Sequence, residues 1–351
     1  MSQPFVLILA GGTGERFWPL SRRNRPKQLL RLFSDQTLLE ETMRRLGDLT
    51  SLDRVLILTN TEQEDAVRTL LGERLPAENI VAEPAKRDTA PAIALGVAWV
   101  ARRDPAATMI VLPADHIIRD AAAFQADLRA ACEAVRLDSS ALVTVGVKPT
   151  WACPGFGYIE FGEAVRERIF RVRRFREKPA PDLAQQFLEE GCFRWNAGMF
   201  VWSIPAILRE LHRQAPELAD FATAYARSAD PAAVLASKFS KLPKISIDYA
   251  VMEKATTTLM VEASFDWDDV GGWPAISGYL PVDAHDNASN RPIVALEASH
   301  NLVYSDSAKN ITLLGVSDLL IVQTDDALLI CPRDRAEHIK QLIPHLPPEL
   351  H

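Results

Sequence analysis

The sequence predicts an α/β protein with a mostly parallel sheet, followed by a small β-rich domain. Over the first 150 residues, short β-branched apolar runs alternate with longer amphipathic stretches. At 351 residues, the chain is long enough for one large domain and one small domain. After about residue 292, short apolar runs are separated by Asp, Ser and Gly turns. The apolar content of 48% excludes intrinsic disorder.

The predicted sheet and its helices come from the first 150 residues. Four apolar runs have the length and composition of buried strands, at residues 5–9, 54–59, 108–112 and 141–147. Four stretches have helical apolar spacing, at residues 37–46, 61–71, 90–102 and 121–137, and Asn60 and Thr61 are typical of the cap that opens the second. Such alternation indicates βαβ units and a parallel sheet covered on both faces. Ligands bind at the carboxyl ends of such strands, so the loops after Leu9 and Leu112 are predicted to carry the site.

The rest of the chain is predicted to be an elaboration of the sheet, a linker and the β-rich domain. Residues 150–279 are irregular, with helices expected near 182–190 and 245–254, and residues 281–291 are polar enough for a linker. Short strands are then expected at residues 293–296, 301–304, 311–314, 319–322 and 328–331, and a helix from 333 to about 342. We therefore predict domains at residues 1–280 and 281–351.

Composition restricts the partners. With 39 basic and 46 acidic side chains the net charge is −7, and no run of five or more like charges exists, so nucleic acid and anionic membranes are not expected as partners. The apolar run at residues 5–10 is too short for a signal peptide or a membrane span, so a cytoplasmic protein is expected. Four widely spaced cysteines without a CxxC pair predict reduced thiols.

A glycine-rich segment follows the first predicted strand. In GGTG at residues 11–14, missing side chains let backbone N–H groups approach a polyanion, and Arg16 and Lys27 supply cations. The pattern is not a dinucleotide-binding fingerprint, because Phe17 stands where the last glycine should fall, and no GK[ST] follows as a P-loop requires. A phosphate-binding loop is favoured over the alternative, a glycine-rich turn with solvated charges.

A second polar loop, EPAKRDTAP at residues 83–91, follows the apolar pair at residues 80–81. Thr89 is a suitable helix cap and Pro91 suits a first helical turn, so the loop should present polar groups beside the sheet end. The alternative is a charged connection with no role in binding.

Two acidic positions could hold a divalent cation. Asp115 follows the strand ending at Leu112, and DWDDVGG at residues 266–272 is a dense acidic cluster that would repel itself without a cation. Mg²⁺ accepts one or two carboxylates together with substrate phosphates. A helix cap is the alternative for a single Asp in such a place, and Asp120 could also cap the next helix.

Three further segments offer the mixture of donors and acceptors that a hexose requires. They are residues 155–160, 177–179 and 195–200, with Gly for close approach and Asn, Glu and backbone groups for hydroxyls. Each alone could be a hairpin, and Trp195, Phe200 and Trp202 are expected in the core. Together the segments favour a sugar pocket.

These motifs resemble a known family. LILAGGTGERFWPLSRRNRPKQLL at residues 7–30 is similar to the signature of sugar-phosphate nucleotidyltransferases, and in particular of the mannose-1-phosphate guanylyltransferases. The resemblance continues in segments at residues 83–92, 112–116, 155–160 with 176–179, and 195–202 with 265–273, and the tail resembles the tail of that family. The resemblance implies a Rossmann-like nucleotidyltransferase domain with a β-helix-like C-terminal domain.

The resemblance also implies roles for individual residues. Catalysis would fall to Arg16, Lys27, Asp115 and Asp269, of which Asp115 and Asp269 would hold Mg²⁺. The nucleotide would contact Leu9, Ala10, Gly11, Gly12, Thr13, Gly14, Glu83, Arg87, Asp88, Thr89, Ala90 and Pro91. The sugar phosphate would contact Gly157, Tyr158, Glu177, Lys178, Asn196 and Gly198.

The function implied is transfer of GMP from GTP to mannose 1-phosphate by a homodimeric enzyme. A nucleotidyltransferase for another base or hexose, and a noncatalytic regulatory homologue, are the alternatives. Four converging charged groups argue against the second, and the glycine pattern argues against a nicotinamide dehydrogenase.

Overall fold

The structure is a computed structural model that describes residues 3–351, and the chain forms two compact units. The first unit contains the described residues up to Gly11, with Thr42–Ala114 and Ile118–Trp267. The second contains Gly12–Glu41, Asp115–Ile117 and Asp268–His351. The glycine-rich segment from Gly12 onward therefore belongs to the same unit as the C-terminal strands.

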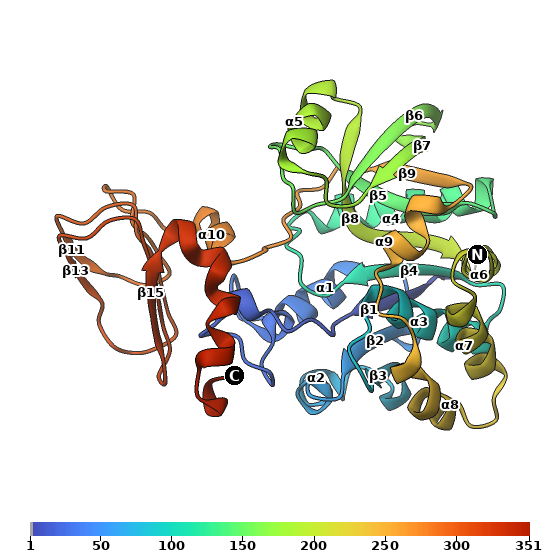
Figure 1. Cartoon of the computed structure of the whole chain (residues 1–351), viewed down its shortest axis with the longest axis horizontal. Coiled ribbons are helices and arrows are strands. Elements are labelled where there is room, and N and C mark those ends of the chain that lie inside the picture. The colour runs from blue at the N-terminus through green and yellow to red at the C-terminus, as the bar shows by residue number, and fades with distance from the viewer. Residues whose placement is uncertain (1–2) are drawn as a thin grey trace. The chain divides into compact units, whose positions relative to one another are not determined.

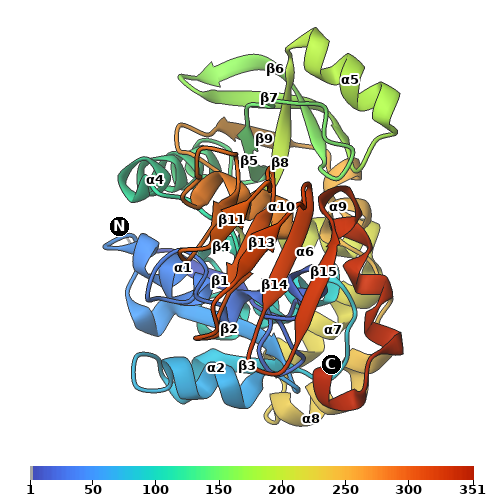
Figure 2. The ribbon, with the colours of Figure 1, turned by 90° about the vertical axis from the view of Figure 1, so that its left-hand side faces the viewer.

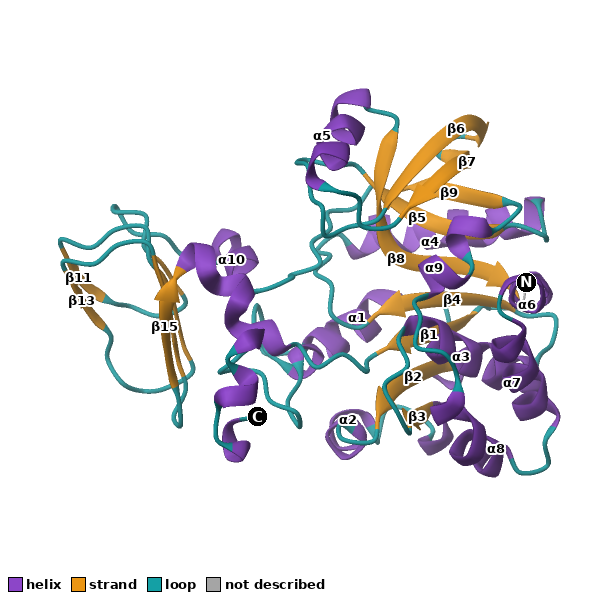
Figure 3. Ribbon diagram, in the orientation of Figure 1, coloured by secondary structure: helices purple, strands orange, loops and turns teal. Residues whose placement is uncertain are grey.

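A nine-stranded sheet forms the centre of the first unit (Figures 1 and 3), in the order β3-β2-β1-β4-β8-β5-β9-β7-β6. Its strands are β1 (Phe5–Leu9), β2 (Val55–Asn60), β3 (Ile80–Glu83), β4 (Thr108–Pro113), β5 (Leu142–Val147), β6 (Tyr158–Arg166), β7 (Ile169–Arg176), β8 (Phe193–Ser203) and β9 (Thr258–Glu262). Seven strands point the same way, while β7 and β8 run opposite to them. The predicted α/β class with a mostly parallel sheet is confirmed.

Helices cover this sheet. They are α2 (Glu64–Leu71), α3 (Thr89–Arg103), α4 (Ala121–Leu137), α5 (Pro181–Glu190), α6 (Ile204–Gln214), α7 (Pro216–Arg227), α8 (Pro231–Lys238) and α9 (Ile247–Ala250), while the residues of α1 (Leu38–Leu46) are divided between the two units. Apolar side chains of α3, α6 and α7 share one buried core with strand residues such as Leu7 and Leu56. Helices α6 to α8 and the central position of β8 were not expected from the sequence.

The second unit contains a β-helix-like stack. Strands β10 (Ala288–Ser289), β12 (Leu302–Ser305) and β14 (Leu319–Gln323) pair in parallel, β15 (Leu328–Pro332) pairs antiparallel with β14, and β11 (Val294–Leu296) pairs with β13 (Thr312–Leu314). Figure 2 shows β14 and β15 side by side. The predicted linker at 281–291 was wrong in part, because β10 lies within it and pairs with β12.

One apolar core joins the early and late segments of the second unit. Phe17, Trp18 and Trp273 pack with Tyr304 and Ile339 in the same buried cluster. Trp273 begins the short helix α10 (Trp273–Ile276). The predicted closing helix is instead a 3₁₀ helix, η8 (Arg333–Gln341).

Two simpler predictions can be compared with the structure directly. All four cysteines are free. Among residues 3–351, no helix is long and apolar enough to cross a membrane.

Candidate active site

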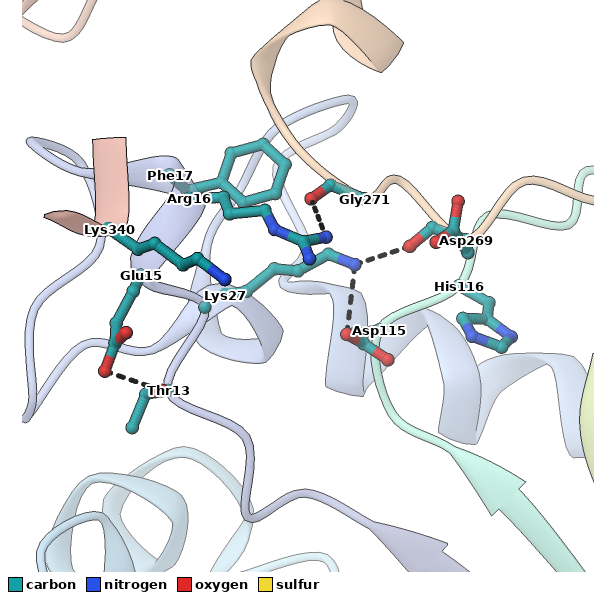
Figure 4. Close-up of a pocket in the computed structure, with 11 residues that line it drawn as sticks. Thr13, Glu15, Arg16, Phe17, Lys27, Asp115, His116, Asp269, Gly271 and Lys340 are labelled. Atoms are coloured by element: carbon teal, nitrogen blue, oxygen red, sulfur yellow. Dashed lines mark hydrogen bonds and ion pairs between the residues drawn. The ribbon is translucent and has the colours of Figure 1, made fainter. Parts of the chain in front are cut away.

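A cavity of about 350 Å³ lies within the second unit (Figure 4). Three segments distant in sequence form its wall: the glycine-rich loop and Lys27, the two residues after Ala114, and the C-terminal part of the chain. Its lining residues are Thr13, Gly14, Glu15, Arg16, Phe17, Lys27, Asp115, His116, Asp269, Gly271 and Lys340. All four residues expected to be catalytic are among them. We name this cavity the phosphate pocket.

Lys27 connects the two sides of the phosphate pocket. Its Nζ lies 3.0 Å from Asp115 Oδ2 and donates a hydrogen bond of 2.6 Å to the backbone oxygen of Asp269. Gly14 has φ +63°, and a Cβ there would lie 2.4 Å from the Cβ of Lys27. The glycine is therefore required for the close approach of the loop to Lys27.

The two aspartates differ in their electrostatics. Burial opposes ionisation of Asp115, but the nearby Lys27 and His116 outweigh it, so the pKa of Asp115 is lowered. Burial raises the pKa of Asp269; Lys27 and Arg16 oppose this rise, while the neighbouring Asp268 and Asp115 add to it. The charge of Asp115 is thus compensated by Lys27, whereas that of Asp269 is compensated less completely.

The donor set is suitable for a divalent cation that is also bound by substrate. No group of three or more His, Cys, Asp or Glu side chains in residues 3–351 is arranged to hold a metal. Asp115 adds to the raised pKa of Asp269, so a shared cation would stabilise both carboxylates, and its other oxygens could come from phosphates and water. Asp115 and Asp269 therefore fit such an ion.

Arg16 is positioned by the turn that follows Asp269. Its Nη1 donates a hydrogen bond of 3.1 Å to the backbone oxygen of Gly271. Val270, which separates Asp269 from Gly271, is fully buried and has φ +47°, in the left-handed region. Val270 is thus buried in the apolar core, while its neighbours Asp269 and Gly271 line the phosphate pocket.

The other acidic residues considered from the sequence have structural partners. Asp266 accepts hydrogen bonds from the backbone N–H groups of Arg119 and Asp120, and Asp120 caps α4. Asp268 accepts from the backbone N–H of Val270 and the hydroxyl of Tyr279. The carboxylates of Asp266 and Asp268 thus have partners within the protein, and Asp269 is the acidic residue of this cluster that lines the phosphate pocket.

The first unit places the second polar loop at the ends of β1 and β3. Glu83 ends β3, and burial raises its pKa to about 8. Its Oε1 is buried without a hydrogen-bond partner among the described residues. Asn60 Nδ2 donates to the backbone oxygen of Gly11, which fixes the chain leaving β1. A ligand with N–H donors would satisfy the buried Glu83 oxygen.

The predicted helix cap in this loop was displaced by one residue. Asp88 caps α3, with Oδ1 accepting from the backbone N–H of Thr89 at 2.7 Å and φ +69°. Thr89 instead accepts a hydrogen bond from the backbone N–H of Ile247. Asp88 takes the cap although its backbone, at φ 69° and ψ −177°, lies in a region that L residues rarely adopt. Pro91 lies in the first turn, as predicted.

The hexose segments converge in the first unit. Gly157, Glu177 and Asn196 lie together: a Cβ at Gly157 would lie 2.3 Å from Glu177 Oε2 and 3.2 Å from Asn196 Cβ. Asn196 Oδ1 also accepts from the backbone N–H of Gly198 at 3.1 Å. Lys178 lies beside Glu177, with Nζ 3.5 Å from Oε1. The three segments are therefore one cluster, which we name the hexose cluster.

Several aromatic residues of these segments belong to the core. Trp195, Phe200 and Trp202 are buried, as predicted. Tyr158 is also fully buried, with its ring 5.4 Å from that of Phe187. The ring of Tyr158 is therefore part of the core, and the contact of this residue with the sugar phosphate stays a prediction.

Sequence reasoning missed two polar residues of these sites. Asp248 accepts a hydrogen bond of 2.9 Å from Asn196 Nδ2 and helps to raise the pKa of Glu177 to about 7, after burial. Lys340 lines the phosphate pocket from η8. Asp248 sits in the first turn of a four-residue helix with weak periodicity, and Lys340 was assigned only to a closing helix.

Known protein families identify the class to which this chain belongs. The chain belongs to the nucleotidyl transferase family, which matches residues 5–283, and a MannoseP isomerase/GMP-like beta-helix domain matches residues 292–346. The family resemblance and the β-helix-like tail expected from the sequence are confirmed.

Mannose-1-phosphate guanylyltransferases are among the relatives to which this chain is similar. The chain is 36% identical to a mannose-1-phosphate guanylyltransferase from Klebsiella pneumoniae, covering 97% of this chain and 73% of that protein. A mannose-1-phosphate guanylyltransferase from Escherichia coli gives the same figures. A crystal structure titled mannose-1-phosphate geranyltransferase, from Thermus thermophilus, superposes with a TM-score of 0.87 at 34% identity and covers 98% of this chain and 99% of that one.

Proposed function

We propose that this nucleotidyltransferase transfers GMP from GTP to mannose 1-phosphate and releases pyrophosphate. The observation that carries the proposal is the junction at Lys27, whose ammonium contacts both Asp115 and the backbone of Asp269 within one pocket that Arg16 also lines. Such a group of cations and carboxylates fits a nucleoside triphosphate with a divalent cation.

The chemistry requires no nucleophilic side chain. A sugar phosphate has a second pKa near 6, so at neutral pH an ionised oxygen can attack without a general base. That oxygen forms a bond to the α-phosphorus, the bond from the α-phosphorus to the bridging oxygen breaks, and its electron pair leaves with pyrophosphate. No proton has to move.

The protein's own task is to hold and neutralise the phosphates. Arg16 would contact the leaving β- and γ-phosphates, and Lys27 would neutralise charge at the reacting centre. Asp115 and Asp269 would hold Mg²⁺, which when bound supplies positive charge to the α- and β-phosphates.

Specificity is proposed to reside in the first unit. Glu83 and the loop at residues 87–91 would contact guanine, whose N–H groups suit the unpartnered, buried oxygen of Glu83. Glu177, Asn196 and Gly198 would contact the sugar hydroxyls, and Lys178 the sugar phosphate. The hexose cluster supports this assignment because it combines acceptors with a cation.

Homodimerisation and a cytoplasmic location also belong to the proposal. On β11 and β13, the side chains of Val294, Leu296 and Leu314 are between 62% and 66% exposed. A second copy of the chain could cover this apolar surface.

The test is pyrophosphate release from GTP, ATP, UTP and dTTP with mannose 1-phosphate and glucose 1-phosphate. A site that pairs buried polar groups with one base rejects other bases by roughly 10⁴ in kcat/KM. We expect GTP with mannose 1-phosphate to be preferred on this scale. Equal activity with ATP, UTP or dTTP would refute the guanylyl assignment, and preference for glucose 1-phosphate would refute the mannosyl one.

A further inference from the structure

The C-terminal 3₁₀ helix η8 contributes a cation to the phosphate pocket that the proposed mechanism does not use. Lys340 is the only residue after Gly271 that lines the pocket in residues 3–351, and it lies more than 300 positions from the glycine-rich loop. Thr13, Glu15 and Arg16 of that loop line the same cavity (Figure 4). A side chain of the β-rich module therefore faces the loop expected to bind the triphosphate.

The position of Lys340 is fixed by the packing of η8. Ala336 and Ile339 are 3% and 2% exposed, and both belong to the apolar cluster that contains Phe17 and Trp18. Phe17 adjoins Arg16, so the same contact that buries Ile339 brings Lys340 to the pocket wall. The backbone of Lys340 is thus anchored, while its long side chain stays exposed.

The three cations of the pocket differ in the number of hydrogen bonds and ion pairs that they form with the protein. Lys27 is held by Asp115 and the backbone of Asp269, and Arg16 donates to the backbone of Gly271. The ammonium of Lys340 has no ion pair or hydrogen bond with any described residue. Among the three cations, Lys340 therefore has the ammonium group that is most available to bind an anionic ligand.

The charge of the lining residues shows why this matters. Besides its three cations, the pocket has three acidic residues, Glu15, Asp115 and Asp269. Lys340 therefore balances one carboxylate of the lining, in addition to the charge that a bound divalent cation would bring. Figure 4 places Lys340 and the two aspartates on opposite sides of Lys27. If the reacting phosphate lies at the aspartates, Lys340 faces the other end of the triphosphate.

We propose that Lys340 binds the β- and γ-phosphates of the nucleotide, and the pyrophosphate formed from them. This rests on the proposed nucleotidyl transfer. It also gives the β-rich module a direct part in the reaction, because a charge on that module would stabilise the leaving group as negative charge develops on it.

The test compares Lys340→Gln with Lys309→Gln, which removes an exposed lysine of the same unit outside the pocket. For Lys340→Gln we expect KM to rise about tenfold for GTP in the forward direction and for pyrophosphate in the reverse direction. KM for mannose 1-phosphate and for GDP-mannose should change less than about twofold. Lys340→Arg should stay within about threefold of the native enzyme, and Lys309→Gln should match it.

A binding measurement separates this inference from the proposed function. Calorimetric titration with pyrophosphate and Mg²⁺ requires no turnover, and we expect Lys340→Gln to bind about tenfold more weakly than the native chain. If the native chain forms no GDP-mannose but binds pyrophosphate about tenfold more tightly than Lys340→Gln does, the proposed function fails while the pyrophosphate site at Lys340 stands. Unchanged pyrophosphate affinity and KM in a folded Lys340→Gln variant, or equal loss in Lys309→Gln, would overturn the inference.

Discussion

In the phosphate pocket, the lysine beside a carboxylate is buried; in the hexose cluster, the corresponding lysine is exposed. The side chain of Lys27 is 8% exposed and lies 3.0 Å from Asp115, whereas that of Lys178 is 61% exposed and lies 3.5 Å from Glu177. The pKa of Asp115 is lowered, while that of Glu177 rises to about 7. Both carboxylates experience burial as the largest single influence.

Two differences accompany this contrast: the lysine beside Glu177 is exposed, and Asp248 and Glu253 add like charge there, whereas Asp115 has Lys27 and His116 beside it. Water screens the charge of an exposed lysine, so Lys178 offsets little of the cost of burying Glu177. A buried lysine is screened less, and Lys27 keeps Asp115 ionised. The exposed lysine of the hexose cluster suits a site that receives neutral hydroxyl groups. The buried lysine of the phosphate pocket suits a site that receives phosphates.

Deleting residues 280–351 should have the largest effect, and it should affect the phosphate pocket first. The deletion removes Lys340 and the apolar partners of Phe17, Trp18 and Trp273. We expect aggregation or loss of self-association, together with loss of activity, measured by sedimentation and pyrophosphate release. A soluble truncated enzyme with native activity and stability would show that the tail is dispensable. The phosphate pocket would then depend on the tail no more than the hexose cluster does.

The next largest effect should come from the two aspartates. Asp115→Asn and Asp269→Asn should each lower kcat on the order of 10²–10³-fold and raise the Mg²⁺ concentration required, in an activity titration against Mg²⁺. We expect Asp115→Asn to have the lower melting temperature of the two, because it deprives Lys27 of its partner. Asp269→Asn removes a carboxyl whose pKa is raised by burial, so it should cost less stability.

Asp268→Asn is the control for these variants. Asp268 binds the backbone of Val270 and the hydroxyl of Tyr279, so its replacement should lower the melting temperature without changing the Mg²⁺ requirement. If Asp268→Asn impaired Mg²⁺ dependence more than Asp115→Asn did, the placement of the metal would be wrong.

The sequence predicted the parts of the fold that have strong periodicity. The first strand, residues 5–9, and the helix at 121–137 match β1 and α4 to the residue, because an uninterrupted apolar run and an amphipathic stretch leave little ambiguity. Helix α6 was not predicted, although Ser203 caps it and a proline lies in its first turn, because β8 ends at Ser203 and no separate turn marks the start of the helix.

The residues that line the phosphate pocket were predicted better than the grouping of the chain segments that carry them. Arg16, Lys27, Asp115 and Asp269 line one cavity, although the last two are 154 positions apart. The grouping of residues 12–41 with the tail could not be predicted, because it depends on an apolar cluster that contains both Phe17 and Ile339. The domain boundary at residue 280 stays a prediction, as do the roles assigned to individual site residues.

The smallest expected effect concerns Glu177 and tests the hexose side of the comparison. Because the pKa of Glu177 is about 7 in the folded chain and 4.5 otherwise, the folded state holds a proton that the unfolded state releases. The stability from this group is complete below pH 4.5 and is lost as the pH rises through 7. Glu177→Gln cannot titrate, so its melting temperature should decline less than that of the native chain between about pH 5 and 8.

Glu83→Gln is the matched control, because burial raises the pKa of Glu83 to about 8, so its contribution to stability is lost over a pH range that starts at the same point and ends higher. Both variants should therefore flatten the decline from about pH 4.5 upward, and they should differ mainly between about pH 7 and 8, where only Glu83→Gln still flattens it. Glu177→Gln should also raise KM for mannose 1-phosphate about tenfold and leave KM for GTP unchanged, because a carboxylate accepts stronger hydrogen bonds from hydroxyls than an amide does. Melting curves for Glu177→Gln that run parallel to the native curves would show that Lys178 compensates Glu177 after all, and the contrast with Lys27 would disappear.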